Sequence, residues 1–438
     1  MSNIASPKRI EPFALHGAIS ARSAAIALAT LVLCLLLISF KPYQPLPEPG
    51  SQTGGDIINQ IGFTGLGLGS ALAMLVLAPR TLLASLLGAG WFVMFGFLAL
   101  SVLNAPDPAS ALRTSIFTLS ALLGVLAVLT LPRDADGLSI VLFTAGILTL
   151  AVSYAGLALF PELAKHTADS VEAEHAGLWR GVFPHKNIAG PVMASLSFAG
   201  VYLYRRGWAV RGSLLFALAF LFMANTGSKT TLGLVPLVAA AVIVPGLIGL
   251  RRLTPVIFAF GMIGGSLATI GIVFIKPLKE LARDLAPNLT YTGRTQLWSF
   301  SGDMIAKKPW TGYGYESFWG TPTVTAMDRF FDQDWDISNI VHGHNGYLDI
   351  AIHMGLPALA AALILFIAVP MFDYARTPLR RENVFLSDFF MMVCIFGAFN
   401  ALLESFFFRR ADPVWLLFFM SLIGLRMTAR FAVQTRTD

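Results

Sequence analysis

The stretch His342-Gly343-His344-Asn345-Gly346-Tyr347-Leu348-Asp349 stands where a long polar segment gives way to an apolar run that reaches about residue 371. A run of that length suffices for a helix across the hydrocarbon core of a bilayer, which is about 30 Å thick. The histidines before it should therefore lie at a membrane surface, where an imidazole titrates near neutrality. This junction predicts both the architecture of the chain and the place of its chemistry.

The composition of the whole chain also indicates a membrane protein. Of its 438 residues, 55% are hydrophobic and only 13% are charged, and the mean hydropathy is +0.69. These values exclude an ordinary soluble globule. The apolar runs are long enough for helices and lack the alternating pattern of membrane β-barrel strands. We expect an all-α integral membrane protein that forms one polytopic domain, residues 1–438.

About twelve apolar runs are candidate membrane spans. They lie near residues 23–40, 61–78, 82–103, 114–131, 138–160, 188–204, 212–224, 231–250, 254–275, 346–371, 385–404 and 413–429. Lys8, Arg9 and Arg22 precede the first run, and no small-residue cleavage site follows it before Lys41. We therefore interpret this run as a retained span rather than a cleaved signal sequence.

The distribution of arginines predicts the orientation of the chain. If both termini are cytoplasmic, the loops on the inner side carry most of the arginines, as the positive-inside rule requires. Residues 161–187, 225–230, 276–345 and 405–412 then lie on the outer face of the membrane. Those outer loops also hold cations that the topology does not require: Arg180, Lys186, Lys229, Arg294, Arg409 and Arg410. An anionic substrate on the outer face would explain them.

Several classes of site are missing from the sequence. Cys34 and Cys394 fall inside apolar runs, so we interpret both as packing residues rather than as a disulfide or a thiolate metal site. The chain has no phosphate-binding glycine–lysine loop, no dinucleotide fingerprint and no spaced cluster of Cys and His metal ligands. We expect no cofactor, no metal and no nucleic-acid partner.

The long loop 276–345 is expected to carry part of the active site, because long loops in compact domains are usually functional. Residues 276–285 and 294–308 have helical spacing and are candidates for helices on the membrane surface. The loop also interleaves carboxylates with aromatic side chains: Asp328, Phe330, Phe331, Asp332, Asp334, Trp335 and Asp336. This mixture is typical of sugar-binding surfaces and equally of a solvated loop anchored at the lipid interface.

Two residues of this loop are candidates for chemistry. His344 could accept a proton from a hydroxyl group, although capping of the following helix by His344 or His342 is an equal alternative. Arg294 follows Gly293, a setting that lets a guanidinium approach a diphosphate with paired hydrogen bonds. Its alternative is the neutralisation of lipid headgroups. His353 is interpreted as a packed core histidine.

Other outer segments supply further candidates. Lys229 follows a short polar break between two spans, and a functional role is favoured because a cation there opposes the expected charge asymmetry. Residues 180–187 bring two cations, an imidazole and an amide together before the sixth span, either to bind an anion or to anchor a helix start at the interface. Glu404 is expected to pair with Arg409 or Arg410, with a role as catalytic base as the alternative.

Three motifs together resemble the O-antigen ligase and exopolysaccharide polymerase superfamily of membrane glycosyltransferases. They are His344-Asn345 followed after nine residues by Gly355, Gly293-Arg294 through Leu297-Trp298, and the turn from Pro309 to Gly314. The resemblance implies a glycan donor linked to undecaprenyl diphosphate and no metal requirement. It implies that Arg294 and Lys229 hold the diphosphate and that His344 engages the acceptor hydroxyl. Residues 180–187 look like the version found in succinoglycan-type polymerases.

These considerations predict a set of site residues. Catalytic roles are expected for His344, Arg294 and Lys229, and substrate-binding roles for Arg180, His185, Lys186, Asn187, Asn345, Glu404 and Arg409. The favoured activity is polymerisation of lipid-linked repeat units into exopolysaccharide or O-antigen. The alternatives are a ligase that transfers the glycan to lipid A-core and a lipid-linked sugar transporter or flippase. The implied partners are the growing polysaccharide or lipid A-core acceptor, membrane lipid, a chain-length regulator and a flippase.

Overall fold

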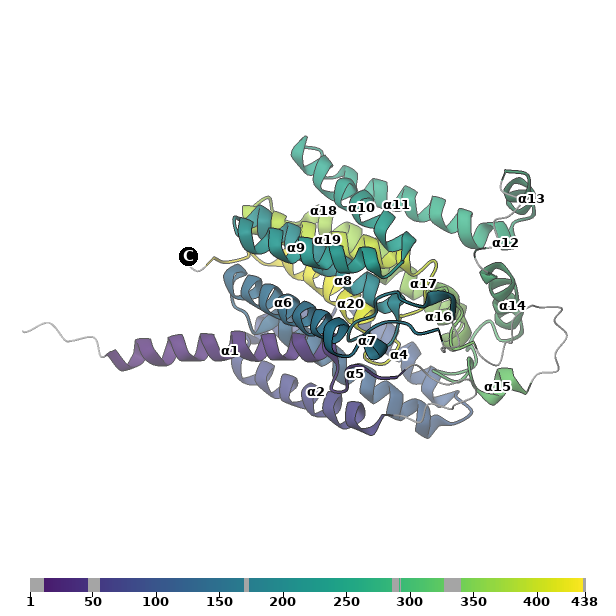
Figure 1. Ribbon diagram of the computed structural model, residues 1–438, viewed down its shortest axis with the longest axis horizontal. Helices are drawn as coiled ribbons and strands as arrows, with labels where there is room; N and C mark the ends of the chain where they lie inside the picture. The colour runs from purple at the N-terminus through teal and green to yellow at the C-terminus, as the bar shows by residue number, and fades with distance from the viewer. Residues whose placement is uncertain are drawn as a thin grey trace, which may run out of the picture.

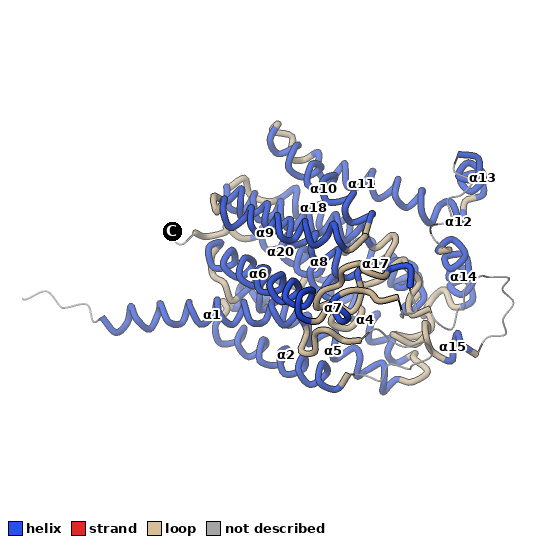
Figure 2. Tube along the Cα trace, in the orientation of Figure 1, coloured by secondary structure: helices blue, strands red, loops and turns tan. Residues whose placement is uncertain are grey.

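The computed structural model describes residues 12–45, 56–168, 173–285, 291, 293–326 and 340–435. Helices account for nearly all regular structure in this part of the chain, and Figure 2 shows no strand in it. An isolated bridge joins Lys165 and Trp179 in a loop. The expectation of an all-α membrane protein is confirmed.

The first half of the chain forms α1 (Pro12–Ile38), α2 (Ile57–Leu77), α3 (Arg80–Leu86), α4 (Ala89–Leu103), α5 (Pro108–Thr130), α6 (Ala135–Leu159), α7 (Pro161–Ala164), η1 (Ala173–His175), α8 (Lys186–Arg206) and α9 (Ala209–Asn225). The second half forms α10 (Lys229–Leu247), α11 (Leu253–Ser266), η2 (Leu267–Gly271), α12 (Ile272–Phe274), α13 (Lys276–Leu285), α14 (Arg294–Lys307), α15 (Pro322–Thr325), α16 (Gly346–Met354), α17 (Leu356–Leu363), η4 (Ile364–Ala368), α18 (Val369–Arg376), α19 (Arg381–Asn400) and α20 (Pro413–Arg430).

Each of the twelve predicted spans falls in a helical region. Nine helical stretches of the described chain are long and apolar enough to cross a membrane, and the bent pair α3 and α4 would make ten. The helix α9 is apolar but shorter. The number of spans therefore stays a prediction, whereas the multi-pass character does not.

The run predicted at 346–371 is interrupted, which corrects the expectation of one continuous helix. Gly355 adopts a φ of +87°, and α16 ends there before the apolar stretch Leu356–Arg376 begins. The turn at Pro309–Gly314 packs against the chain at this break. The amide of Leu356 donates to the Pro309 carbonyl at 2.7 Å, and a Cβ at position 355 would collide with the Trp310 carbonyl. Only glycine tolerates this conformation and this close approach together.

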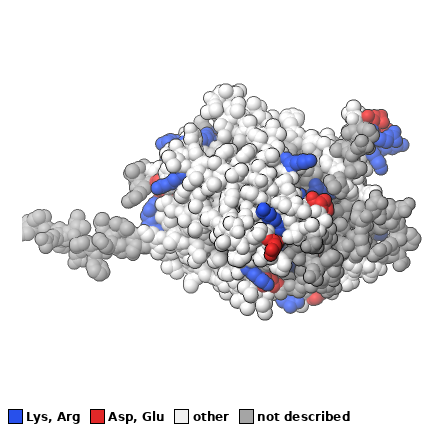
Figure 3. Space-filling view, viewed as in Figure 1, with Lys and Arg blue, Asp and Glu red and all other residues white. Residues whose placement is uncertain are grey.

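The centre of the bundle is formed by α8, α19 and α20, which pack on one another. The apolar windows of α19 and α20 are 78% and 72% buried inside the protein, against 22% for α2 and for the stretch Leu253–Phe274. The peripheral helices therefore present apolar side chains outward, as lipid-facing helices must. Figure 3 shows a wide uncharged area over the middle of the helices.

The two ends of the bundle differ. In Figure 1, α1 begins and α20 ends at the same end, which also holds the short connections between the helices. Arginines at that end pair with buried carboxylates, as in Arg206 with Glu382 at 2.8 Å and Arg205 with Asp388 at 2.8 Å. The opposite end carries α7 and the helices α13 to α16. The residues singled out by the sequence motifs lie at this second end.

Candidate functional site

Asn345 fixes the start of α16 and ties it to the segment after α19. Its side-chain oxygen accepts hydrogen bonds from the amides of Tyr347 and Leu348 at 3.1 and 3.0 Å, which caps the helix. Its side-chain amide donates to the Leu402 carbonyl at 2.9 Å, and its backbone amide donates to Ser405 Oγ at 3.0 Å. Because Asn345 is fully buried and these bonds occupy both ends of its amide, it has a structural role in place of the expected substrate contact.

Residues 342–345 form a loop before α16, called the histidine loop below. Asp349, in the first turn of α16, holds this loop in place by hydrogen bonds. One carboxylate oxygen accepts from Trp319 Nε1 at 2.8 Å, and both oxygens accept from the Gly343 amide at 3.2 and 3.1 Å. A side chain at position 343 would collide with this carboxylate at 2.5 Å. The glycine between His342 and His344 is thus required for the loop to approach α16 this closely.

His344 occupies a strained backbone position at the tip of this loop. Its φ is +49°, a region that non-glycine residues seldom adopt. Its amide donates to His342 Nδ1 at 3.3 Å, and the two imidazole rings lie 4.1 Å apart between centroids. Such strain persists where surrounding contacts enforce it, and it is concentrated at functional sites.

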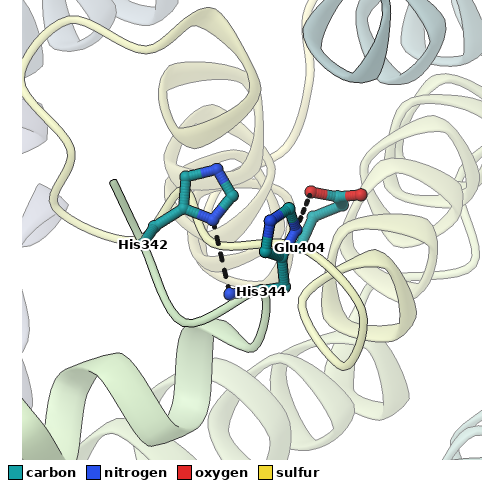
Figure 4. Close-up of side chains that lie close together, drawn as sticks. All are labelled: His342, His344 and Glu404. Carbon is teal, nitrogen blue, oxygen red and sulfur yellow. Dashed lines mark hydrogen bonds and ion pairs between the residues drawn. The ribbon is translucent and has the colours of Figure 1, made fainter. Parts of the chain in front are cut away.

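Glu404 joins two of the predicted catalytic residues, Arg294 and His344, and Figure 4 shows its contact with His344. One of its oxygens accepts from Arg294 Nη2 at 2.8 Å, and the other lies 3.3 Å from His344 Nδ1. The first oxygen also accepts from the side-chain amide of Asn187 at 3.1 Å. These four residues come from the start of α14, the loop before α16, the segment after α19 and the first turn of α8.

The positive charges around Glu404 keep it ionised. Burial would raise the pKa of Glu404, but the hydrogen bond from His344 and the charges of His344, Arg294 and His185 outweigh burial and hold the pKa below its ordinary range. His342, by contrast, is held in its uncharged form. Burial, together with the charges of His344 and Arg409, keeps the pKa of His342 well below its usual value, so its ring is neutral.

The structure gives Glu404 partners other than those expected from the sequence. The predicted pairing with Arg409 or Arg410 is replaced by the contacts with Arg294, His344 and Asn187. Arg409 donates instead to the Ser405 carbonyl at 3.3 Å, and Arg410 lies 3.9 Å from a carboxylate oxygen of Glu316.

The segment before α8 contributes a cluster of imidazoles beside Asn187. His185 caps α8 by accepting from the Asn187 amide at 3.1 Å, and the amide of Lys186 donates to His166 Nε2 at 3.2 Å. The rings of His166, His175 and His185 lie within 4.7 to 5.9 Å of one another, measured between centroids. The electrostatic contact of His185 with Glu404 places this cluster next to the site.

Two predicted cations differ in accessibility. Arg180 is 1% exposed, and its guanidinium donates to the carbonyls of Lys165, Phe183, Pro184 and Gln44. It therefore braces the loop rather than presenting itself to a ligand, and we leave it out of the site. Lys229 is exposed at the first position of α10, where an anion could reach it.

A pocket opens on the other side of the histidine loop. The pocket has a volume of about 510 Å³, which includes open solvent at its mouth. Aromatic side chains line it together with polar ones: Tyr315, Trp319, Phe407, Phe408, Glu316, His342, Asp349, Ser405 and Arg409. Backbone strain gathers here too, since Glu316, Phe408 and Arg410 all have positive φ.

A metal ion is a poor match for the gathered side chains. One ligand atom from each of His342, His344 and Glu404 lies within 4.8 Å of the others, which is close enough for a shared ion. However, the Arg294 guanidinium already supplies a positive charge to Glu404 at 2.8 Å. A divalent cation there would be repelled by this fixed charge.

The depressed pKa of Glu404 predicts how the site responds to acid. A carboxylate whose folded-state pKa is lowered adds stability above its unfolded pKa and loses that stability as the pH falls through the folded value. The melting-temperature difference between wild type and Glu404→Gln should therefore persist down to about the ordinary pKa of 4.5 and close only below it. Thermal melting in detergent across this range measures the difference. Closure of the gap near neutral pH would contradict the assignment.

Several functional features were beyond sequence reasoning. Asp349 accepts hydrogen bonds from Gly343 and Trp319. The sequence gives no indication of these bonds except that Asp349 follows the two histidines closely in the chain. The contact of Asn187 with Glu404 joins positions 217 residues apart. His353 is half-buried rather than a core residue: its Nδ1 lies 3.1 Å from the Gly314 carbonyl, and its side chain lines the pocket. The acidic and aromatic positions at 328–336 lie outside the described residues.

Comparison with known families agrees with the resemblance found in the sequence. Residues 213–363 match the family described as O-Antigen ligase, a range that includes Lys229, Arg294, His344 and Gly355. Asn187 and Glu404 lie outside the matched range. No curated protein matches the chain.

Proposed function

We propose, from the match of residues 213–363 to the O-antigen ligase family, that the protein polymerises glycan repeat units carried on undecaprenyl diphosphate at the periplasmic face of the bacterial inner membrane. The observation that carries the proposal is the convergence of Arg294, His344 and Asn187 on Glu404. This convergence sets a cation and an oriented imidazole side by side, as glycosyl transfer from a diphosphate requires.

The reaction first requires stabilisation of the negative charge on the departing diphosphate. As the bond between the anomeric carbon and the diphosphate oxygen breaks, negative charge grows on that oxygen. Arg294 and Lys229 are assigned to this charge. Among the described residues, the Arg294 side chain donates to Glu404 through Nη2, and a guanidinium carries five N–H donors. Lys229 adds a point charge rather than a paired contact.

The reaction also requires a base that removes the proton of the acceptor hydroxyl. Glu404 accepts from Nδ1 of His344, which leaves Nε2 of the same ring to take the proton of the acceptor hydroxyl. The acceptor oxygen then bonds to the anomeric carbon as the diphosphate leaves with the bonding electron pair. Attack opposite the leaving group inverts the anomeric centre. The carboxylate stabilises the imidazolium that forms, as in other carboxylate–histidine pairs.

The pocket beside His342 is assigned to the acceptor sugar. Aromatic faces and polar groups such as Glu316 and Arg409 form a lining suited to sugar rings and their hydroxyls. The resemblance of residues 180–187 to succinoglycan-type polymerases favours chain extension over transfer to lipid A-core. Both termini are assigned to the cytoplasm, since the connections at the end of the bundle where α1 begins hold arginines such as Arg205 and Arg206.

The proposal is tested with purified protein in proteoliposomes that contain lipid-linked repeat units from the native strain. A ladder of longer glycans still linked to the carrier lipid is expected without any other acceptor. Transfer that occurs only after lipid A-core is added would establish the ligase and overturn polymerisation. Movement of the lipid-linked unit across the bilayer without a new glycosidic bond would overturn both and identify a transporter.

A further inference from the structure

The helix α13 has no buried residue, although it lies within the loop that carries Arg294. Leu281 and Leu285 are 52% and 77% exposed. Figure 1 shows α13 at the far end of the bundle, beyond α12 and set off from the central helices. An exposed leucine-bearing helix of this kind needs an explanation, because burial against the rest of the described protein does not provide one.

The sequence of α13 separates its side chains into two faces. At 100° per residue, one face collects Pro277, Leu278, Leu281, Ala282 and Leu285. The other face collects Lys276, Lys279, Glu280, Arg283 and Asp284. The polar face is itself divided, since the three cations follow one edge at spacings of three and four residues while the two carboxylates follow the other edge.

The position of α13 in the chain decides what meets the apolar face. The apolar stretch Leu253–Phe274 is long enough to span a membrane, and α13 begins two residues after it ends. The Leu278 side chain lies against Gly271, in the last turns of that stretch. A helix that starts where a membrane span ends, with one apolar face, is placed in the headgroup region.

We propose that α13 lies in the plane of the membrane surface and binds anionic phospholipid. Leu281 and Leu285 enter the acyl-chain boundary, and the edge formed by Lys276, Lys279 and Arg283 contacts headgroup phosphates. This lipid contact is separate from the glycan chemistry proposed above and does not depend on it.

The contact would fix the height of Arg294 relative to the bilayer. The helix α14 packs on the end of the same span, where a side chain at Gly302 would collide with the ring of Phe274. Arg294 is the first residue of α14. A membrane-bound α13 therefore holds the guanidinium near the level at which a lipid-linked diphosphate emerges from the bilayer.

The test uses an environment-sensitive fluorophore on single cysteines, with Cys34 and Cys394 replaced by alanine. Leu285→Cys reports on the apolar face and Asp284→Cys on the polar face of the full-length protein. In phosphatidylcholine vesicles containing phosphatidylglycerol, a quencher attached to the acyl chains should quench the label at 285 and spare the label at 284. Equal exposure of both labels to water would overturn the proposal, and so would equal protection of both, which indicates a protein partner.

A second comparison addresses the lipid charge. Replacing the three cations, K276Q/K279Q/R283Q, should abolish the part of the quenching at 285 that depends on phosphatidylglycerol. The matched variant E280Q/D284N should retain it. Quenching that is the same in vesicles with and without phosphatidylglycerol would refute recognition of anionic lipid. Because the readout is depth in the membrane, failure here leaves the proposed glycan transfer to be judged by its own assay.

Discussion

Replacing Glu404 with glutamine should lower the rate of glycan transfer by about 10⁴-fold, the scale of loss seen when the acid of a carboxylate–histidine pair becomes an amide. Glutamine keeps the size of the side chain but removes the charge that orients His344 and stabilises its protonated form. The contact between Glu404 and His344 Nδ1 at 3.3 Å carries this expectation. The measurement is single-turnover elongation of lipid-linked repeat units in proteoliposomes.

Two companion variants sharpen this result. His344→Ala should be at least as impaired as Glu404→Gln, and the double variant no worse than His344→Ala, because the pair acts as one unit. Glu162→Gln, at an exposed position of α7, makes the same chemical change away from the site and should behave as wild type. If Glu404→Gln transferred glycan at the wild-type rate, the imidazole would not need its carboxylate, and the proposed mechanism would fail.

Replacing Arg294 with alanine should slow transfer by about 10²- to 10³-fold, the usual cost of removing one group that stabilises charge in a transition state. In the proposed mechanism the guanidinium faces the developing charge of the diphosphate, and in the structure it pairs with Glu404 at 2.8 Å. Arg294→Lys should recover only part of the rate, because an ammonium group cannot form paired hydrogen bonds with phosphate oxygens. Single-turnover rates of the two variants, measured in the same vesicles, give the comparison.

The control for Arg294 lies on the same helix. Lys307 is an exposed cation at the last position of α14, and Lys307→Ala should leave the rate unchanged. A fall in melting temperature for Arg294→Ala, with normal transfer by the protein that stays folded, would reduce Arg294 to a structural partner of Glu404. Full rescue by lysine would show that only a point charge is needed.

Much of the architecture follows from local sequence properties. A bilayer accepts only helices with internal hydrogen bonds or closed barrels, so long apolar runs are sufficient to predict an all-α membrane protein. The helices at residues 276–285 and 294–307 also appear in the structure close to where their spacing predicts them. The break at Gly355 could not be predicted from the sequence, because it depends on the turn at Pro309–Gly314 packing into it, and these two motifs lie about 40 residues apart in the chain.

The sequence by itself determined the membrane class, the helical runs, the loop that carries Arg294 and His344, and the match of residues 213–363 to the O-antigen ligase family. Only the tertiary structure shows that Glu404 contacts both of those residues and that Asn187 also donates to Glu404. It also shows that the Arg180 guanidinium donates its hydrogen bonds to backbone carbonyls. The physical reason is the range of the forces involved. Hydropathy and helical periodicity act between near neighbours in the chain, whereas ion pairs and hydrogen bonds between helices depend on how segments some 200 residues apart pack together.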